Sequence, residues 1–296
     1  MSQPDATLIE QDGVPALPSE IANPSDEQIQ DVVAAMQAAE KRGIVDWQPG
    51  SFVGFSLNAG LLELGDGRLV KYGKLVTYTE ALAMEYVRQN TTIPVPKVHM
   101  VFVRRGMTHI VMDLLPGSEL METAYKMSED ELRRIAEQLH DYVTQLQNLG
   151  GLHAGEAIRQ WPSGGPLRNV RFYLPDPSDE FHSLEEFHSY WLQRAISENM
   201  DVSKLTVMPS GTAKTTLGHG DLMSANILVR GGEITGVLDW ETFGWYPDFW
   251  DGMIIHDLSV TRQTRAAIRA VFGVPSDLAV HFGDLRFKAE YNRSRL

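Results

Sequence analysis

The chain has 296 residues, of which 43% are apolar and 22% charged, and this composition is typical of an ordinary soluble globular protein. It contains no cysteine, which excludes disulfides, thiolate zinc sites and cysteine nucleophiles. Its formal net charge of −13 argues against a general binder of the nucleic-acid backbone, because such binding depends on clustered Lys and Arg. The same charge is interpreted either as favouring solubility or as an acidic cleft that attracts a cationic acceptor.

The N-terminal segment, MSQPDATLIEQDG, is acidic and lacks the basic and apolar regions of a secretory signal peptide. No apolar run approaches the ~18–20 residues that a membrane-spanning helix needs. We therefore expect a cytoplasmic protein that binds neither a membrane nor nucleic acid, and we leave its oligomeric state open. Residues 1–24 hold several prolines and scattered acids without periodicity, which predicts a mobile arm.

The first half of the chain alternates between the helical and the strand period. Ser25 and Gln28 have the spacing of a capping box, which predicts the start of a helix. Glycine-containing turns between apolar runs predict two β-hairpins. The predicted elements are a helix over 25–43, a hairpin over 61–72, a helix over 79–89 and a hairpin over 98–114.

The second half is mostly helical. Ser128 with Glu131, and Ser183 with Glu186, again have capping-box spacing. The predicted elements are a helix over 128–150, a long loop over 151–180, a helix over 183–199 and a hairpin over 226–239. A strand-rich half followed by a helix-rich half predicts an α+β chain with two lobes.

Three polar residues surround the last predicted hairpin. Asp221 lies in a loop before it, Asn226 begins its first strand, and Asp239 ends its second strand. The glycine turn between the strands brings Asn226 and Asp239 to the same end. Carboxylate and amide oxygens are hard ligands suited to Mg²⁺, and a separate carboxylate can accept a hydroxyl proton. Metal-assisted phosphoryl transfer needs that division of labour.

The motif His219-Gly220-Asp221-x-x-x-x-Asn226 resembles the catalytic loop of the protein-kinase-like superfamily, and Asp239-Trp240-Glu241 stands where those proteins carry a metal-binding Asp. The HGD and DWE forms are most similar to the aminoglycoside phosphotransferase and choline kinase family, in particular to its fungal members. The resemblance covers about residues 50–260. It implies a protein-kinase-like bilobal fold, with a β-rich, nucleotide-binding N-lobe over 25–115. The mainly helical C-lobe over 116–296 would hold a catalytic β-hairpin and bind the acceptor.

The resemblance also implies the reaction, an ATP- and Mg²⁺-dependent transfer of a phosphoryl group to a hydroxyl of a small molecule. The acceptor would be aminoglycoside-, amino-alcohol- or sugar-like. Asp221 would be the catalytic base, and Asn226 and Asp239 would be the magnesium ligands. His219 is interpreted as a scaffold for the catalytic loop rather than as a proton relay.

The nucleotide-binding residues that the resemblance implies lie in the first half. Lys71 would hold the α- and β-phosphates, paired with an acid of the following helix. Glu80 and Glu85 both qualify as that acid, and we favour Glu80. The segment Met112-Asp113-Leu114 matches the inter-lobe hinge, whose backbone would hydrogen-bond the adenine, although a plain strand end is the alternative.

Other residues near the motif have competing interpretations. The aromatic residues after Asp239 are expected to pack in the core rather than to stack on an acceptor; they are Trp240, Trp245, Tyr246 and Trp250. Three acids of the same segment are candidates for recognising a cationic acceptor: Glu241, Asp248 and Asp251.

The chain departs from protein kinases in several places. Ser51–Ser56 stands where a Gly-rich phosphate loop is expected, but it does not carry that motif. Met223 stands where many protein kinases carry a lysine, and no A-P-E segment follows. A protein kinase and a non-catalytic nucleotide-binding module remain as alternatives. The segment after Asp239 is short beside the relatives, whose acceptor site is built from later helices, so the acceptor is not identified.

Overall fold

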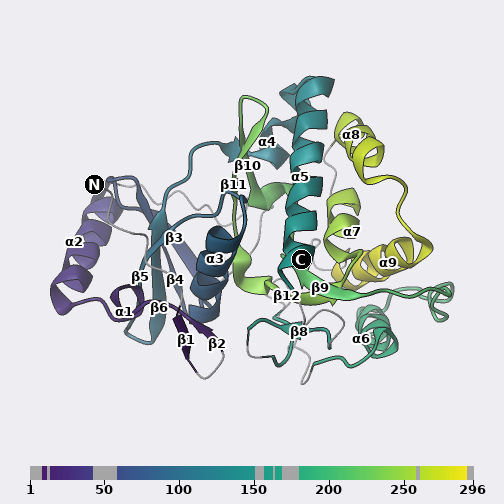
Figure 1. Cartoon of the computed structure of the whole chain (residues 1–296), viewed down its shortest axis with the longest axis horizontal. Coiled ribbons are helices and arrows are strands. Elements are labelled where there is room, and N and C mark those ends of the chain that lie inside the picture. Colours follow the sequence, from purple (N-terminus) through teal and green to yellow (C-terminus); the bar gives the residue numbers. More distant parts are fainter. Residues whose placement is uncertain are drawn as a thin grey trace. The chain divides into compact units, whose positions relative to one another are not determined.

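The computed structural model describes residues 9–11, 14–42, 59–150, 157–162, 164–168, 180–257 and 261–291. The chain divides into two compact units: unit 1 is Met1–Gly117 with Thr235–Glu241, and unit 2 is Ser118–Ile234 with Thr242–Leu296 (Figure 1). The return of the chain to unit 1 over Thr235–Glu241, which begins within the last hairpin, was not expected from the sequence. The segment Ser51–Ser56 and most of the predicted loop over 151–180 lie outside the described residues.

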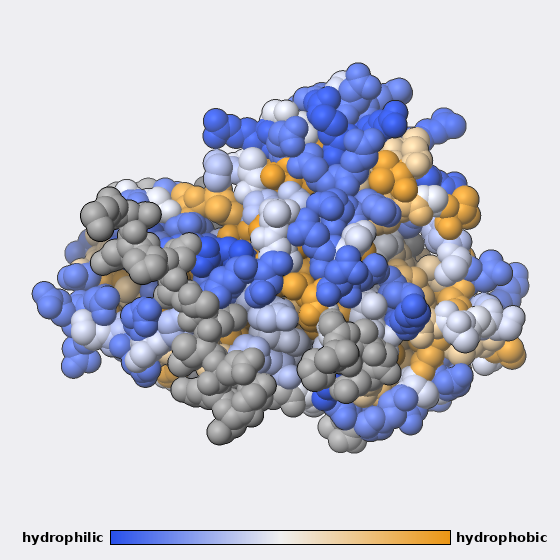
Figure 2. Space-filling view, in the orientation of Figure 1, coloured by the Kyte–Doolittle hydropathy of each residue, from blue (hydrophilic) through white to orange (hydrophobic). Residues whose placement is uncertain are grey.

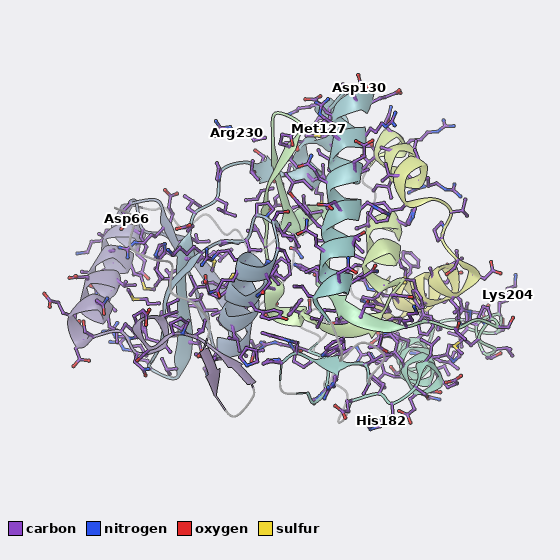
Figure 3. All side chains as sticks on the ribbon, in the orientation of Figure 1. Asp66, Met127, Asp130, His182, Lys204 and Arg230 are labelled. Carbon is purple, nitrogen blue, oxygen red and sulfur yellow. The ribbon has the colours of Figure 1, made fainter. Side chains whose placement is uncertain are left out.

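Unit 1 combines strands and helices in the predicted order of hairpin, helix and hairpin. Its elements are β1 (Ile9–Gln11), β2 (Val14–Ala16), α1 (Ser19–Ala22), α2 (Asp26–Arg42), β3 (Ala59–Glu63), β4 (Arg68–Gly73), α3 (Tyr78–Asn90), β5 (Val98–Arg104) and β6 (Met107–Asp113). Four of these strands form an antiparallel sheet with the order β3-β4-β6-β5. Figure 3 labels Asp66 in the turn between β3 and β4.

One face of this sheet packs against α2. The apolar side chains of α2 and of the sheet form a single buried cluster: Val32, Met36, Ala39, Leu62, Leu64, Val70, Met100, Phe102 and Val111. Successive side chains of a strand point to opposite faces. The neighbours of these residues along each strand therefore point away from α2.

The N-terminal segment that we predicted as a mobile arm instead contains β1, β2 and α1. β1 and β2 pair as an antiparallel hairpin. Leu17 and Ile21 are buried, and the backbone N–H of Leu17 donates a 3.1 Å hydrogen bond to the hydroxyl of Tyr78 in α3. Elements of three or four residues are too short to show a hydrophobic period, so the sequence pattern could not reveal them.

Unit 2 is mainly helical. Its helices are α4 (Leu120–Thr123), η1 (Ala124–Lys126), α5 (Glu129–Leu149), α6 (Leu184–Ser197), η3 (Ser224–Asn226), α7 (Trp250–Asp257), α8 (Arg262–Phe272) and α9 (Asp277–Tyr291). Its strands are β7 (Ser118–Glu119), β8 (Arg159–Gln160), β9 (Thr215–Gly218), β10 (Ile227–Arg230) and β12 (Gly244–Pro247). The division between the units passes through β11 (Glu233–Val237) and the turn η4 (Trp240–Thr242).

α5 begins with the capping box that the sequence predicted. The hydroxyl of Ser128 accepts a hydrogen bond from the backbone N–H of Glu131, and the Glu131 carboxylate accepts one from the Ser128 N–H. The apolar side chains of α5 are buried on one side, and the exposed side is hydrophilic (Figure 2). Asp130 marks this end of the helix in Figure 3.

The strands of unit 2 form small sheets. β12 pairs with both β8 and β9, and β10 pairs with β7. β8 lies inside the segment that we predicted as a loop, and with two residues it too is below the length at which a period can be seen. Arg230, labelled in Figure 3, precedes the Gly231-Gly232 turn to β11.

The core of unit 2 is an aromatic and aliphatic cluster that joins α6, α7, α9 and β12. Its members include Phe187, Trp191, Tyr246, Trp250, Ile254, Phe282 and Leu285. Among the described residues, no helix is both long enough and apolar enough to cross a membrane.

Candidate active site

Lys71 lies on the face of β4 that points away from α2, because its neighbour Val70 belongs to the cluster under α2. Its ammonium contacts α3, with Nζ 2.7 Å from Oε1 of Glu80. Glu80, rather than Glu85, is therefore the acid that pairs with Lys71. Glu85 stands about 140° further round the helix, and its Oε1 accepts a 2.8 Å hydrogen bond from the backbone N–H of Val98.

Asp239 is the second acid on Lys71, with Oδ1 2.7 Å from Nζ. We predicted that Asp239 ends its strand, but β11 ends at Val237, and Asp239 lies two residues beyond it. Its backbone φ of 66° is in the left-handed region, which non-glycine residues rarely adopt. The chain therefore leaves the strand ladder before Asp239, and this is why a simple hairpin pattern misplaced it. Glu241 adds a third carboxylate, with Oε2 3.9 Å from the ammonium.

Three carboxylates thus surround one ammonium. Burial alone would lower the pKa of Lys71, but the attraction of Asp239, Glu80 and Glu241 outweighs burial and raises that pKa well above its usual value. In the ionised state the cluster carries three negative charges against one positive charge, an excess of two. A divalent cation would neutralise this excess, and carboxylate oxygens are ligands that Mg²⁺ prefers. The chemistry of these donors therefore fits a magnesium ion.

In unit 2, Asn226 holds the side chain of Asp221. We predicted that Asn226 begins the strand, but it ends η3, one residue before β10. Its Nδ2 donates to the backbone carbonyl of Asp221 at 2.9 Å and to Oδ2 of the carboxylate at 3.2 Å. Because Nδ2 makes these contacts, the amide oxygen Oδ1 remains as the atom that could ligate a metal. Both side chains are buried.

The backbone just before Asp221 is held at four polar atoms. The Asp251 carboxylate accepts hydrogen bonds from the N–H of His219 at 2.7 Å and of Gly220 at 2.9 Å. The hydroxyl of Thr242 donates to the His219 carbonyl at 2.8 Å, and the indole of Trp250 donates to the Gly220 carbonyl at 3.2 Å. Buried backbone groups of a loop need such partners, so these contacts define the loop conformation.

The catalytic-loop glycine is required by its conformation and by its neighbours. Gly220 has a φ of 83°, and a Cβ there would meet a ring carbon of Tyr246 at 2.6 Å and the Thr242 carbonyl oxygen at 2.7 Å. The Tyr246 hydroxyl donates to that same carbonyl, and burial raises the pKa of Tyr246 well above its usual value. Burial also raises the pKa of Asp251, against the lowering effect of His219 and of the two N–H donors.

The aromatic residues after Asp239 are buried, and the three nearby acids have different environments. Trp240, Trp245, Tyr246 and Trp250 are all at most 4% exposed, so core packing is confirmed for them. The ring of His219 accepts a hydrogen bond of 3.3 Å from the backbone N–H of Asp221, which is a scaffold contact. Of the three acids considered for a cationic acceptor, Asp251 holds the loop, Glu241 is buried near Lys71, and Asp248 is exposed.

The hinge segment is only partly available to a ligand. Met112 is buried in β6. The backbone N–H of Asp113 donates to the carbonyl of Lys97, and that of Leu114 donates to the carbonyl of Gly67. We expected the backbone of this segment to hydrogen-bond an adenine, and two of its N–H groups already have partners within unit 1. Leu114 itself lies after β6, whose last residue is Asp113.

Asp221 has a second contact that the sequence did not reveal. Nη2 of Arg286, in α9, lies 3.6 Å from Oδ1 of Asp221, and both side chains are buried. No spacing or motif links the two positions. The sequence gives one weak indication of the role of Asp251, which is its place in the apolar run Trp250–Ile255. An acid buried in such a run needs hydrogen-bond donors or a counter-charge for its carboxylate.

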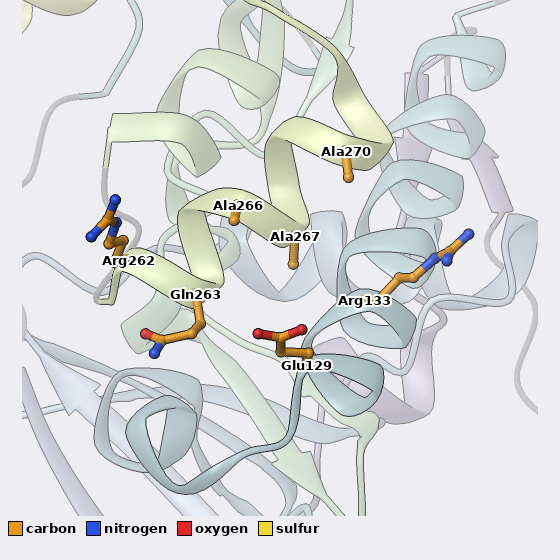
Figure 4. A pocket seen from close by; sticks show the side chains of 7 residues that line it. All are labelled: Glu129, Arg133, Arg262, Gln263, Ala266, Ala267 and Ala270. Carbon is orange, nitrogen blue, oxygen red and sulfur yellow. The ribbon is translucent and has the colours of Figure 1, made fainter.

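Among the described residues, no group of three or more His, Cys, Asp or Glu side chains is arranged to hold a metal ion. A cavity of about 450 Å³ lies between the start of α5 and α8, where Glu129 lies opposite Ala267 of α8 (Figure 4). None of the candidate site residues lines this cavity.

The model of the family described as "Phosphotransferase enzyme family" (APH) matches residues 74–277. The match covers more than half of the chain, so the chain belongs to this phosphotransferase family. A curated relative, clavilactone A biosynthesis cluster protein Y of Ampulloclitocybe clavipes, is 29% identical, over 55% of this chain and 48% of the relative. The chain thus spans about half the length of the curated relative that it matches.

Solved aminoglycoside phosphotransferases have a similar fold. APH(4)-Ia matches with a TM-score of 0.54 and 13% identity, covering 92% of this chain and 98% of that chain. A thermostable mutant of it, in complex with ADP and hygromycin B, matches with a TM-score of 0.53 and 13% identity over 79% and 80% of the two chains. ADP-bound APH(2'')-Ib matches with a TM-score of 0.51 and 13% identity over 90% and 87%. At these identities the similarity concerns the fold alone, and it confirms the predicted kinase-like α+β fold.

Proposed function

We propose that this chain transfers the γ-phosphoryl group of ATP, with Mg²⁺, to a hydroxyl group of a small molecule. The observation that carries the proposal is the ion pair of Lys71 with Glu80 and Asp239, at 2.7 Å each, in a member of a phosphotransferase family. An ammonium held in this way is fully charged and aimed, which suits it to bind nucleotide phosphates. The second support is Asp221, a carboxylate oriented by Asn226.

The residues divide into three roles. Lys71 binds the α- and β-phosphates, and Glu80 orients its ammonium. Oδ1 of Asn226 and the carboxylate of Asp239 would hold magnesium, which when bound would neutralise charge on the phosphates. The adenine contact of the hinge falls to carbonyl oxygens of Met112-Asp113-Leu114, because two of its N–H groups already donate within unit 1.

Asp221 acts on the acceptor. Its carboxylate receives the proton of the acceptor hydroxyl as that oxygen bonds to the γ-phosphorus. The bond from this phosphorus to the β–γ bridging oxygen breaks, and ADP leaves with the electron pair. The protein contributes mainly by positioning the reacting groups and by balancing their charge. Apart from accepting the proton, its side chains form no covalent bond to the reacting groups.

The acceptor is a hydroxyl-bearing aminoglycoside-, amino-alcohol- or sugar-like molecule. The support is that a structurally similar phosphotransferase was crystallised with ADP and hygromycin B. Exposed Asp248 is the remaining candidate among the three acids for recognising a cationic acceptor. The charge of the acceptor is therefore left to experiment.

The test is ADP release with ATP and Mg²⁺ across a panel of aminoglycosides, amino alcohols and neutral sugars. We expect release to rise with at least one class of acceptor, and Asp221→Asn to lower turnover by roughly 10²–10⁴ while ATP still raises the melting temperature. The proposal fails if Asp221→Asn turns over as fast as the unmodified protein. Labelling of proteins but of no small molecule would point to a protein kinase. The absence of any Mg²⁺-dependent ATP effect on melting would point to a non-catalytic module.

A further inference from the structure

The contact between Arg286 and Asp221 is a buried ion pair at the proposed catalytic base. Nη2 of Arg286 is 3.6 Å from Oδ1 of Asp221, and the two side chains are 6% and 9% exposed. A separation of 3.6 Å is too long for a hydrogen bond. The guanidinium therefore acts on the carboxylate through its charge.

A buried charge pair requires an explanation, because its desolvation cost can exceed its Coulombic gain. Stability alone would be served as well by apolar residues of similar volume. The segment from His219 to Asn226 contains no lysine or arginine, so the catalytic loop itself supplies no such cation. In this structure the cation comes from a distant helix.

The two oxygens of Asp221 are held from different elements. Oδ2 receives the Nδ2–H of Asn226 at 3.2 Å, and Oδ1 faces Arg286. Contacts to both oxygens set the plane of the carboxylate, which a single contact leaves free to rotate. A base positioned in this way needs little reorganisation when it accepts a proton.

α9 is built to hold the guanidinium in place. Phe282 and Leu285, on the turn that precedes Arg286, are fully buried in the core cluster of unit 2. Trp250, which bonds the catalytic-loop carbonyl of Gly220, belongs to the same cluster. The helix that carries Arg286 and the residues that brace the loop therefore share one rigid core.

We propose that Arg286 is a positioning residue for the catalytic base, supplying the positive charge that holds and orients the Asp221 carboxylate. This inference rests on the proposed function, because Asp221 must be the group that receives the acceptor proton. Arg286 acts through Asp221 and is not asked to touch the substrates.

The test compares Arg286→Ala and Arg286→Met with a matched control, Arg194→Ala. Arg194 in α6 is also a buried arginine of unit 2, at 8% exposed, and it stacks on Tyr190 rather than on a site residue. We expect both Arg286 variants to lower kcat by about 10- to 100-fold with little change in the KM for ATP. Arg194→Ala should keep a kcat within about twofold of that of the unmodified protein when each is assayed at the same number of degrees below its own melting temperature.

Chemical rescue separates positioning from a structural role. Guanidinium ion at ~10 mM, far below denaturing levels, should raise the kcat of Arg286→Ala several-fold by entering the space left by the side chain. It should not raise the kcat of Arg194→Ala or of the unmodified protein. Arg286→Met keeps the apolar stem, so it carries the kcat comparison if Arg286→Ala does not fold.

Each outcome decides the matter. A kcat of Arg286→Met equal to that of the Arg194 control, or no rescue of folded Arg286→Ala, overturns the positioning role while leaving the proposed function intact. An unmodified protein that releases no ADP with any acceptor overturns the proposed function, and this inference with it. A loss of kcat in Arg286→Met, together with rescue of folded Arg286→Ala by guanidinium, supports both the positioning role of Arg286 and the proposed function.

Discussion

The carboxylate of Asp251 accepts a hydrogen bond of 2.7 Å from the backbone N–H of His219. Its other oxygen accepts one of 2.9 Å from Gly220, so one side chain of α7 holds the backbone directly before Asp221. Hydrogen bonds to an ionised acceptor are roughly twice as strong as neutral ones, and burial strengthens them further. The position of the proposed base therefore depends on an acid that takes no part in the proposed chemistry.

Asp251→Asn is expected to lower the free energy of unfolding by about 1–3 kcal/mol, because the new amide nitrogen cannot accept and one buried N–H loses its partner. Denaturant unfolding measures this loss, and amide hydrogen exchange at residues 219 and 220 locates it. Asp248→Asn, at an exposed position nearby, is the control and should change neither. Unchanged exchange at both amides in Asp251→Asn would contradict the bracing role.

Lys71 and Glu80 should be energetically coupled in the protein without nucleotide. Lys71→Met leaves Glu80, which is 2% exposed, as a buried charge without its closest counter-charge, and is expected to cost about 3 kcal/mol of stability. Adding Glu80→Gln should recover about 1–2 kcal/mol of that loss. Denaturant unfolding of the two single variants and the double variant gives the coupling energy.

The surface pair of Arg68 and Asp66 is the control for that cycle. Its side chains are 31% and 47% exposed, and such pairs contribute about 0–1 kcal/mol. We expect Arg68→Met to change stability by less than Lys71→Met does. A coupling energy between Lys71 and Glu80 no larger than that of this surface pair would show that their contact is not a buried ion pair in solution.

The parts of this protein that could be predicted are those with a local signal. The capping box of Ser128 and Glu131 and the apolar stripe that follows place α5 to within a residue. Glycine turns between apolar runs placed the hairpins. The residues alone left both Glu80 and Glu85 open as the partner of Lys71. Glu80 was favoured because the segment from Glu80 through Val98 resembles the family's helix-to-strand connection, and its 2.7 Å ion pair with Lys71 agrees with that choice.

The parts that could not be predicted depend on contacts between distant segments. Asp239 adopts a φ of 66°, which no residue pattern announces in an Asp-Trp-Glu run. Asp251 was considered from its charge as a candidate for recognising a cationic acceptor. Its hydrogen bonds to the loop before Asp221 give it a structural role instead. Arg286 contacts Asp221 only because α9 packs into the core of unit 2. Tertiary packing, not local preference, places such residues.

Asn226 is expected to determine how strongly ATP binding depends on the concentration of Mg²⁺. Asn226→Ala removes the proposed oxygen ligand Oδ1, and we expect at least about tenfold more Mg²⁺ to be needed for half of the ATP-induced rise in melting temperature. Asn90→Ala, at an exposed asparagine near the end of α3, is the control. Identical Mg²⁺ titrations for Asn226→Ala and the unmodified protein would remove Asn226 from the proposed metal site.

Two stacked histidines join α6 to α9, and they should make the protein sensitive to acid. The rings of His188 and His281 lie 5.0 Å apart, and Nε2 of His281 is buried without a hydrogen-bond partner. Burial, reinforced by His188 and partly offset by Asp284, lowers the pKa of His281 in the folded protein. The unfolded chain therefore takes up a proton at a higher pH than the folded chain does.

The sign of the effect follows from that difference in proton uptake. The stability that neutral His281 contributes is fully present above about pH 6.5, the ordinary pKa of histidine in an unfolded chain. It is lost progressively as the pH falls from there through the lower pKa of His281 in the folded protein. We expect the denaturant midpoint to fall between pH 7.5 and pH 5.5, and to fall less in His281→Phe, which keeps an aromatic ring against His188. His182→Gln, at an exposed histidine, should fall as much as the unmodified protein. Equal falls in His281→Phe and the unmodified protein would show that the acid sensitivity arises elsewhere.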